Sequence, residues 1–424
     1  MKKFLALIIA LVMALSLVAC GEQKQPETPD VPDDGGDQQQ TATIKVGFIT
    51  LHDENSTYDL NFINAAKEAI ANLGLTENDY ILKTNVPEGQ ECYDAAAELA
   101  DAGCNIIFAD SFGHEPYMIQ AAKDFPNVQF CHSTGTRAHT EGLSNYHNAF
   151  ASIYEGRYLA GIAAGMKLNE MIEAGQFTAD QAKMGYVGAF TYAEVVSGYT
   201  SFYLGAKSVC PTVTMDVTFT GSWYDETLEK EGAQKLIAGG CKLISQHADS
   251  LGAPTACENA GVPNVSYNGS TITAGPNTYI ISSRIDWAPY YEMAIKAVMD
   301  GTEIPADYTG NLSTGSVVLT DLNTAVAAEG TQAAIDAAKA KLESGELHVF
   351  DCSTFTVSGA NVKDTMKVDA DGHLTSYMAD VNTDEAYTGD TEVVHDGYFS
   401  ESEFRSAPYF DLFIDGINTL DTAF

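Results

Sequence analysis

Short apolar runs alternate with amphipathic stretches along most of this chain. In the first third, compact apolar runs predict buried strands at 44–49, 80–84, 105–109 and 128–131. Between these runs, apolar positions three and four residues apart predict helices at 61–73, at 93–102 and in a stretch that ends near Pro126. Strands that alternate with helices in this way form parallel sheets covered by helices. The first third is therefore predicted to be an α/β unit.

The same alternation is repeated further along the chain. Helices are predicted at 153–168, 195–209, 227–238 and 253–260, and strands at 183–189, 213–218, 243–245 and 265–267. Two successive units of similar size indicate two lobes, and about 380 residues are enough to give each lobe its own core. Because loops at the carboxyl ends of parallel strands face each other between such lobes, we expect a ligand cleft there.

The carboxyl-terminal region has a different pattern. Residues 355–368 and 374–378 flank Asp369-Ala370-Asp371-Gly372, which has the chemistry of a hairpin turn. Its aspartates suggest a calcium loop, but the D-x-D-x-D-G spacing of such a loop is incomplete. A plain turn is therefore predicted here.

The amino terminus has the features of a secreted lipoprotein. Lys2 and Lys3 precede an apolar run at 4–19, which is too short to span a membrane comfortably. The run ends in Leu17-Val18-Ala19-Cys20-Gly21, a lipobox in which the thiol of Cys20 receives a lipid and the signal is cut just before it. Acyl chains contribute about 0.8 kcal/mol per buried CH₂, so Cys20 is predicted to anchor the protein at a membrane surface.

Residues 22–41 are predicted to be a flexible tether. The stretch has no aromatic residue and, apart from Val31, no large aliphatic one. It therefore cannot bury enough apolar surface to order itself. A coil of this length reaches on the order of 25 Å, so the domain would work just outside the lipid surface.

Charge and cysteine usage narrow the class of protein. The net charge of −36 argues against nucleic-acid binding and against contact with anionic lipid other than through the anchor. Besides Cys20, seven cysteines are present without a CxxC pair, and an odd number cannot form a closed set of disulfides. We expect them to be buried free thiols: Cys92, Cys104, Cys131, Cys210, Cys241, Cys257 and Cys352.

Catalytic and cofactor signatures are missing from the sequence. It contains no G-x-S-x-G elbow, H-E-x-x-H motif, Walker A loop or dinucleotide fingerprint, so neither an enzyme nor a bound cofactor or metal is expected. Four histidines, His114, His132, His139 and His147, are interpreted as exposed loop residues. His247 and Asp249 together with a serine leave open the alternative of a hydrolase.

Residues just after the predicted strands form the candidate site. These stretches are 52–61, 110–113, 190–192, 221–225 and 246–250, and they combine aromatic rings with amides and carboxylates. Rings stack on ring faces, and carboxylates accept hydrogen bonds from sugar hydroxyls. The candidate residues in these stretches are Tyr58, Asn61, Ser111, Phe112, Phe190, Trp223, Asp225, His247 and Asp249. They suit a flat heterocycle joined to a polyol, although the composition also fits a sugar.

Several motifs of the chain resemble one family. The stretch Glu155-Gly156-Arg157-Tyr158-Leu159-Ala160-Gly161 resembles the E-G-x-Y-L-A-G block of the basic membrane protein lipoproteins, which include purine nucleoside receptors of ABC importers. The resemblance covers about 43–319 and continues in six further blocks: Thr57-Tyr58, Ser111-Phe112-Gly113, Phe125-Pro126-Asn127-Val128, Ser222-Trp223-Tyr224-Asp225, Gln246-His247-x-Asp249-Ser250 and Trp287-x-Pro289-Tyr290-Tyr291.

The resemblance implies an α/β type I periplasmic-binding-protein fold, with two doubly wound lobes joined by three crossovers. It implies an amino-terminal lobe at 43–150 and 283–305 and a carboxyl-terminal lobe with the tail at 151–282 and 306–424. A base would lie near Tyr58, Asn61 and Phe112 of one lobe and Phe190 and Trp223 of the other. Asp249 and Trp287 would complete the cleft.

Two positions depart from the family pattern. The family often has aspartate where this chain has Asn61, and its ribose-binding aspartate is replaced by Asn268 or Ser270. We therefore expect a lipid-anchored, extracytoplasmic protein that captures a nucleoside of the purine type and delivers it to the permease of an ABC importer. A receptor for a free nucleobase or a sugar is the alternative, and a cell-surface nucleoside hydrolase or a ligand sensor is the alternative from another class.

Overall fold

The computed structural model describes residues 44–382 and 389–421, which belong to one compact unit, Ala42–Phe424. The predicted signal peptide at 1–19, the lipidated Cys20 and the tether up to residue 42 lie outside the described residues. Within the described part of the chain, no helix is long and apolar enough to cross a membrane.

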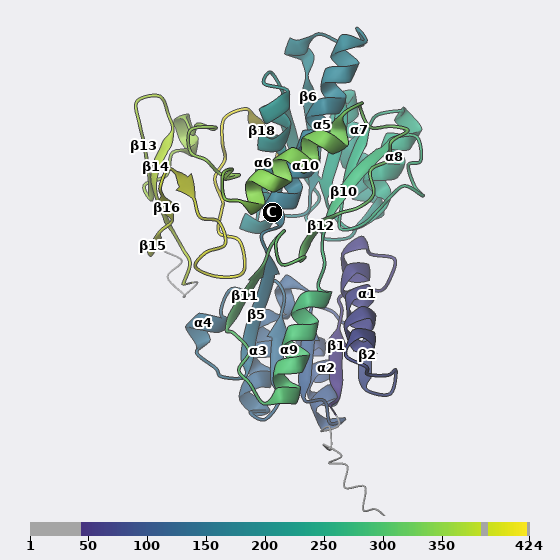
Figure 1. Ribbon diagram of the computed structural model, residues 1–424, viewed down its shortest axis with the longest axis vertical. Helices are drawn as coiled ribbons and strands as arrows, with labels where there is room; N and C mark the ends of the chain where they lie inside the picture. The colour runs from purple at the N-terminus through teal and green to yellow at the C-terminus, as the bar shows by residue number, and fades with distance from the viewer. Residues whose placement is uncertain (1–43, 383–388, 422–424) are drawn as a thin grey trace, which may run out of the picture. The chain divides into compact units, whose positions relative to one another are not determined.

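The first sheet consists of parallel strands, and helices cover both of its faces (Figure 1). Its strand order is β11 (Asp307–Gly310), β5 (Tyr146–Ala151), β4 (Gln129–His132), β3 (Ile106–Ala109), β1 (Val46–Ile49) and β2 (Tyr80–Lys83). One face carries α1 (Thr57–Asn72) and α9 (Ala288–Asp300), and the other carries α2 (Gln90–Asp101) and α3 (Glu115–Asp124). Alternate strand residues such as Phe48 and Ile49 face these two cores, as expected for a sheet buried on both sides.

The second sheet is parallel except at one edge, where β12 runs antiparallel to β10. Its order is β12 (Val317–Leu319), β10 (Tyr279–Ile285), β9 (Asn264–Tyr267), β8 (Leu243–His247), β6 (Lys183–Gly188), β7 (Thr214–Phe219) and β18 (Ile417–Thr419). Four helices cover its two faces: α5 (Ile153–Glu173), α6 (Ala193–Val209), α7 (Glu226–Ala238) and α8 (Gly252–Ala260).

Glycines allow α5 and α6 to pack closely. A Cβ atom on Gly161 would lie 2.1 Å from the carbonyl oxygen of Phe202, and one on Gly205 would lie 2.0 Å from the carbonyl oxygen of Tyr158. No side chain fits at such distances, because the backbones themselves meet at this crossing. The glycines of the Glu155–Gly161 block thus have a packing role in the second lobe.

The chain passes between the two sheets three times. The crossings lie between β5 and α5, between β10 and α9, and between β11 and β12. The second crossing begins after Ile285, and the third begins after Gly310. The lobe boundaries that the resemblance implies, at 283 and 305, lie a few residues earlier in the chain. The predicted fold class, with two doubly wound lobes and three crossovers, is confirmed.

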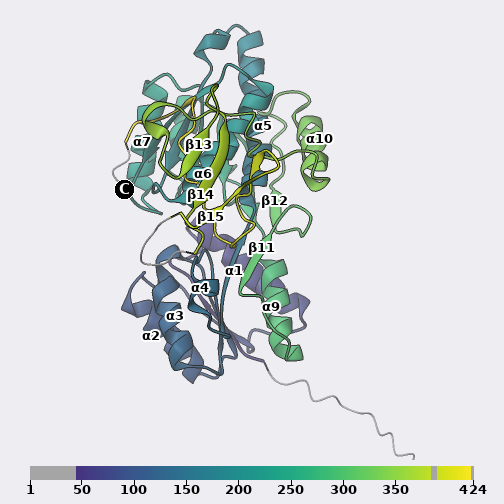
Figure 2. The same ribbon diagram turned by 90° about the vertical axis from the view of Figure 1, so that its left-hand side faces the viewer.

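The carboxyl-terminal segment, residues 350–382 and 389–421, contacts both lobes. It carries β13 (Met366–Val368), β14 (Leu374–Ala379), β15 (Thr391–Glu392), β16 (Val394–His395) and β17 (Tyr398–Phe399), and Figure 2 shows β13, β14 and β15 on the side that faces the viewer. It follows α10 (Thr331–Glu343), which packs on α5. Ser197 of α6 donates a hydrogen bond to the carboxylate of Glu401, and Ser406 donates one of 2.8 Å to Asp307 of β11.

The interpretation of the four histidines as exposed loop residues is wrong for three of them. His114, His132 and His147 are buried, and burial lowers the pKa of each to about 4. Their Nε2 atoms lie 2.9 Å from Val86 O, 2.6 Å from Ser111 O and 2.8 Å from Gln129 Oε1. Only His139, on α4 (Ala138–Glu141), is partly exposed, and its Nδ1 lies 3.0 Å from Asp307 Oδ2.

The predictions for cysteines and for the late turn are confirmed. All seven cysteines of the described residues are buried and free. In the turn between β13 and β14, the Asp369 carboxylate accepts hydrogen bonds of 2.9 Å from the backbone amides of Asp371 and His373. The carboxylate therefore closes the turn itself, and no cluster of metal-ligating side chains is present among the residues described.

Candidate ligand-binding site

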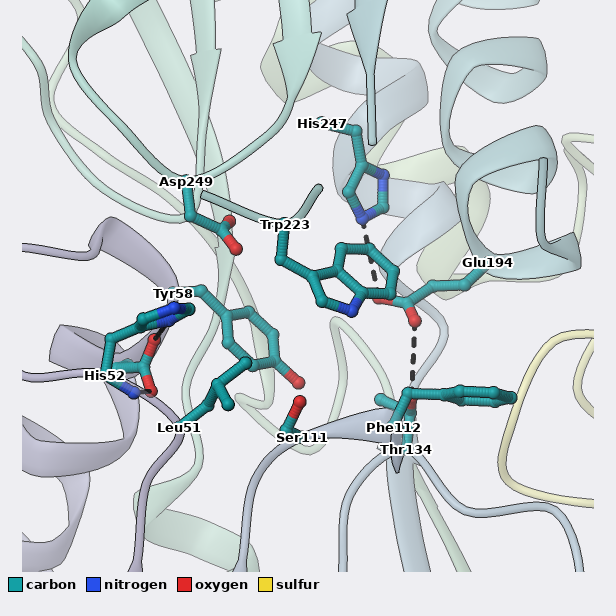
Figure 3. Close-up of a pocket in the computed structure, with 11 residues that line it drawn as sticks. Leu51, His52, Tyr58, Ser111, Phe112, Thr134, Glu194, Trp223, His247 and Asp249 are labelled. Carbon is teal, nitrogen blue, oxygen red and sulfur yellow. Dashed lines mark hydrogen bonds and ion pairs between the residues drawn. The ribbon is translucent and has the colours of Figure 1, made fainter. Parts of the chain in front are cut away.

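A cavity lies between the two lobes, at the carboxyl ends of their parallel strands (Figure 3). The space between its walls measures about 360 Å³, open solvent at its mouth included. The first lobe contributes Leu51, His52, Tyr58, Asp59, Ser111, Phe112 and Thr134. The second contributes Glu194, Trp223, His247 and Asp249.

The start of α1 positions Tyr58 on the first wall. Ser56 caps the helix by accepting a 3.2 Å hydrogen bond from Asp59 N, so the helix begins at Thr57 rather than at the predicted Asn61. The Tyr58 hydroxyl donates a 2.8 Å bond to the carbonyl oxygen of Asp110. Burial raises the pKa of Asp59, but bonds from His52 and Ser56 outweigh it and hold this pKa below its usual value.

The carboxylate of Glu88, at an exposed position, holds the turn that carries Phe112. This turn is the short helix η1 (Phe112–His114). The Glu88 carboxylate accepts a 2.5 Å bond from Ser111 Oγ and a 2.8 Å bond from Gly113 N. With its backbone held on both sides, Phe112 borders the cavity (Figure 3).

Further aromatic rings stand behind Trp223 on the opposite wall. Phe190 and Tyr192 stack with centroids 4.9 Å apart, and Phe190 meets Trp223 edge-on at 4.9 Å. Tyr192 also stacks on Phe112 of the first lobe. The four rings thus form a continuous run, of which Phe112 and Trp223 line the cavity.

A carboxylate connects the two lobes inside the cavity. Glu194 Oε2 accepts a 3.2 Å hydrogen bond from the Thr134 hydroxyl, and Glu194 Oε1 lies 3.4 Å from His247 Nε2 (Figure 3). Burial lowers the pKa of His247, although Glu194 opposes this shift. Burial thus disfavours the charged form of His247, whose Nε2 faces Glu194.

Asp249 is a buried carboxyl with few partners. Its Oδ1 accepts a 3.0 Å bond from the Asn268 amide, and its backbone oxygen accepts a 3.0 Å bond from Thr57 N of the other lobe. Burial raises the pKa of Asp249 well above its usual value, and the carboxylates of Asp59, Glu229 and Glu194 add to this shift. A ligand that donates hydrogen bonds to the Asp249 carboxylate would stabilise its ionised form and so lower this pKa.

The structure brings six of the eleven sequence-predicted residues to the cavity: Tyr58, Ser111, Phe112, Trp223, His247 and Asp249. Phe190 and Asn268 stand directly behind this lining, against Trp223 and Asp249 respectively.

The other three predicted residues are not among the lining side chains. Trp287 is only 2% exposed and stacks on Phe62 at 4.4 Å, inside the core. The Asp225 carboxylate caps α7 by accepting bonds from Thr227 N and Leu228 N. Asn61 lies on α1, beyond the part of the helix that borders the cavity.

Two of the most informative residues, Thr134 and Glu194, are missing from the sequence-based set. Each lies shortly after a strand, β4 and β6 respectively, so the strand-end rule would have found both. His52 and Asp59 belong to the stretch at 52–61, but the sequence does not indicate that their side chains face the cavity. The structure places both in the lining, in contact with each other.

Comparisons with known proteins identify the family. Residues 47–349 match the family described as ABC transporter substrate-binding protein PnrA-like. The chain belongs to this family. Its members bind a substrate and deliver it to a permease, so they act outside the cytoplasm as receptors rather than as enzymes.

Curated relatives of the chain carry several ligand names. It is 31% identical over 319 residues to the purine-binding protein of Brucella abortus, with 74% of this chain and 85% of that protein covered. It is 32% identical over 258 residues to a protein named as an ABC transporter glucose-binding protein of Haloferax volcanii, covering 61% and 62%. A nucleoside-binding protein of Lactococcus lactis is 23% identical, covering 59% and 67%.

Solved structures share the fold. A solute-binding protein of Aeropyrum pernix matches with a TM-score of 0.61 and 18% identity, over 72% of this chain and 93% of that chain. One from Conexibacter woesei matches with a TM-score of 0.58 and 22% identity, over 72% and 98%. At this identity the likeness supports the fold alone.

Proposed function

We propose that this protein captures a purine nucleoside in the cavity between its lobes and delivers it to the permease of an ABC importer. The observation that carries the proposal is that stacking rings and hydrogen-bond acceptors converge on one closed space. Phe112 and Trp223 face it from opposite lobes, beside Asp59, Glu194 and Asp249.

The aromatic part of the site supports a flat ring as ligand. A heterocycle placed between Tyr58, Phe112 and Trp223 would gain ring contacts on both faces, and such pairs contribute about 0.5–1.5 kcal/mol each beyond the burial of area. The small room between the walls favours a planar group over a bulky one, because a planar group needs the least separation of the lobes.

The polar part supports a ligand rich in N–H and O–H donors. Three carboxylates and two imidazoles line the cavity, and charge-assisted hydrogen bonds to carboxylates are among the stronger ones. A purine nucleoside offers donors on both the base and the ribose. Names of two relatives, a purine-binding and a nucleoside-binding protein, support the same ligand class.

A free purine base is the alternative within this class. Asn268 occupies a position where the related receptors are expected to have a ribose-binding aspartate, and its amide is already engaged with Asp249. A sugar is the second candidate, favoured by the relative named for glucose and by the mixture of rings and carboxylates that also suits pyranoses.

A hydrolase has less support in the geometry. His247 Nε2 faces Glu194, and the buried Nδ1 has no hydrogen-bond partner among the described residues. No serine is therefore hydrogen-bonded to His247 in the manner of a catalytic triad. We propose that the protein is a receptor and not an enzyme, held at the membrane by a lipid on Cys20.

Isothermal titration calorimetry of the purified domain with adenosine, adenine and glucose tests the proposal. We expect binding of adenosine in the micromolar range or tighter, reported also by a change in Trp223 fluorescence. Trp223→Ala should weaken it at least tenfold, whereas Phe404→Ala, an exposed ring of the carboxyl-terminal segment, should not change it. Absence of binding by any nucleoside or base at millimolar concentration would refute the proposal.

A further inference from the structure

Glu194 occupies an unusual place in the cavity. It lies in the first turn of α6, with its side chain only 10% exposed. Its carboxylate accepts from Thr134 of the first lobe and faces His247 of the second. The same group therefore touches both lobes and the space between them (Figure 3).

The carboxylate of Glu194 has acceptor capacity left for a ligand. An ionised carboxylate offers about four lone-pair positions. Thr134 and His247 occupy one on each oxygen, and the residue also lines the cavity. An N–H group of a ligand in the cavity can therefore bond to Glu194 without displacing either protein partner.

The charged groups of the lining favour an uncharged ligand that donates hydrogen bonds. Asp59, Glu194 and Asp249 are the carboxylates among the lining residues, and this lining contains no lysine or arginine. The buried guanidinium of Arg157 is not among the lining groups and is bonded to Tyr186, Ser245 and the carbonyl of Ser266. In a space of low dielectric, this arrangement repels an anion and stabilises a neutral donor.

We propose that Glu194 determines the specificity of this cavity. It accepts a hydrogen bond from an amino or ring N–H of the bound purine, and its charge makes the site reject ligands that carry a phosphate or carboxylate. This inference rests on the proposed function, because it assigns the discriminating group of the same site. The expected ligands are thus uncharged purine compounds, and nucleotides are excluded.

Two variants separate this role from a merely structural one. Glu194→Gln keeps the shape and the bond from Thr134 but removes the charge. Thr134→Val removes the interlobe hydrogen bond and leaves the acceptors of Glu194 intact. If Glu194 acts only by joining the lobes, Thr134→Val weakens all ligands alike, whereas Glu194→Gln, which keeps this bond, leaves the affinity for each ligand nearly unchanged. If Glu194 bonds to the ligand and repels anions, only Glu194→Gln changes the ratio of the affinities for neutral and anionic ligands.

The test is calorimetric titration of the wild-type protein and both variants with adenosine and adenosine monophosphate, and with adenine and purine-6-carboxylate. We expect the wild type to prefer the neutral member of the pair that it binds by at least 100-fold. Glu194→Gln should narrow this ratio at least tenfold, and Thr134→Val should leave it within threefold. Thermal melts confirm that each variant is folded.

The outcomes distinguish the two proposals. If the wild type binds none of the four compounds, the proposed function fails. If it binds adenosine or adenine but takes the anionic partner equally well, or if Glu194→Gln leaves the ratio unchanged, the function stands and the role of Glu194 is overturned.

Discussion

Phe112 and Tyr192 come from opposite lobes, and their rings stack with centroids 5.1 Å apart and planes 29° from parallel. Both rings remain partly exposed, at 36% and 39%, so the stack forms at the rim of the cleft and not in its interior. This stack and two polar contacts hold the lobes together. One polar contact lies between Thr134 and Glu194, and the other between Thr57 and Asp249. Ligand entry must break all three.

Removing one ring of this stack should ease opening of the cleft. Tyr192→Ala is expected to weaken ligand binding roughly two- to tenfold, since an aromatic pair contributes about 0.5–1.5 kcal/mol. The loss should be in the dissociation rate, because the stack stabilises the closed form. Stopped-flow recording of Trp223 fluorescence measures both rates. Phe404→Ala is the matched control, and a slower association with unchanged dissociation would contradict this role.

Asp249 should make stability depend on pH. Because its pKa is raised on folding, the folded protein binds a proton that the unfolded chain releases above about pH 4. The contribution of this group to the unfolding free energy therefore falls as pH rises from about 4 through neutrality. Asp249→Asn removes this effect while its side-chain oxygen can still accept from Asn268.

The measurement is Tm between pH 4 and pH 8. We expect the Tm of the Asp249→Asn protein, relative to that of the wild type, to rise by roughly 2 °C or more as pH rises over this range. The variant should also bind its ligand more weakly. Glu77→Gln, at an exposed position, should follow the wild type. If the difference in Tm between variant and wild type stays constant across the range, folding does not raise the pKa of Asp249.

The crossing of α5 and α6 should not tolerate a methyl group. Gly161→Ala would place its Cβ 2.1 Å from Phe202 O, so the helices must separate. Overpacking of this kind costs about 1–3 kcal/mol, and urea unfolding should show it as a lower midpoint. Gly232→Ala, in α7, meets nothing closer than 3.4 Å and should leave the midpoint unchanged or raise it. Equal effects of the two changes would disprove the packing argument.

The lipid anchor is testable in cells. Cys20→Ala should release the protein from the membrane fraction into the medium or the soluble extracytoplasmic fraction, because no acyl chain can then be attached. Immunoblots of separated fractions measure this. Gln25→Ala, in the predicted tether, should stay with the membrane, and retention of the Cys20→Ala protein would mean that something other than a lipid holds it.

The sequence predicts the framework of the site well, because strand-end loops of parallel sheets converge whatever their detailed conformation. Tyr58, Phe112, Trp223 and Asp249 lie in such loops, are also implied by the resemblance to the family, and line the cavity. The type of fold followed from the alternation of strands and helices and from the resemblance to the family.

Side-chain direction could not be predicted in the same way. Trp287 follows a strand as Trp223 does, but it turns into the core onto Phe62. Strand β5 was missed because its buried His147 and Asn148 break the apolar pattern, and only partners distant in sequence, such as Gln129, satisfy their polar atoms. The pairing of Thr134 with Glu194 likewise requires the two lobes to be brought together first.

Strand β18 also affects how the protein behaves at high concentration. It pairs with β7, and just after it Leu420 N donates to Val217 O of the same strand, so the side of β7 is covered. An uncovered strand presents a row of free backbone groups on which a second molecule can add its own strand. Shortening the chain before residue 417 would remove β18 and leave β7 as such an edge of the second sheet. A shortened protein should therefore self-associate and precipitate during expression, even with its ligand cavity intact.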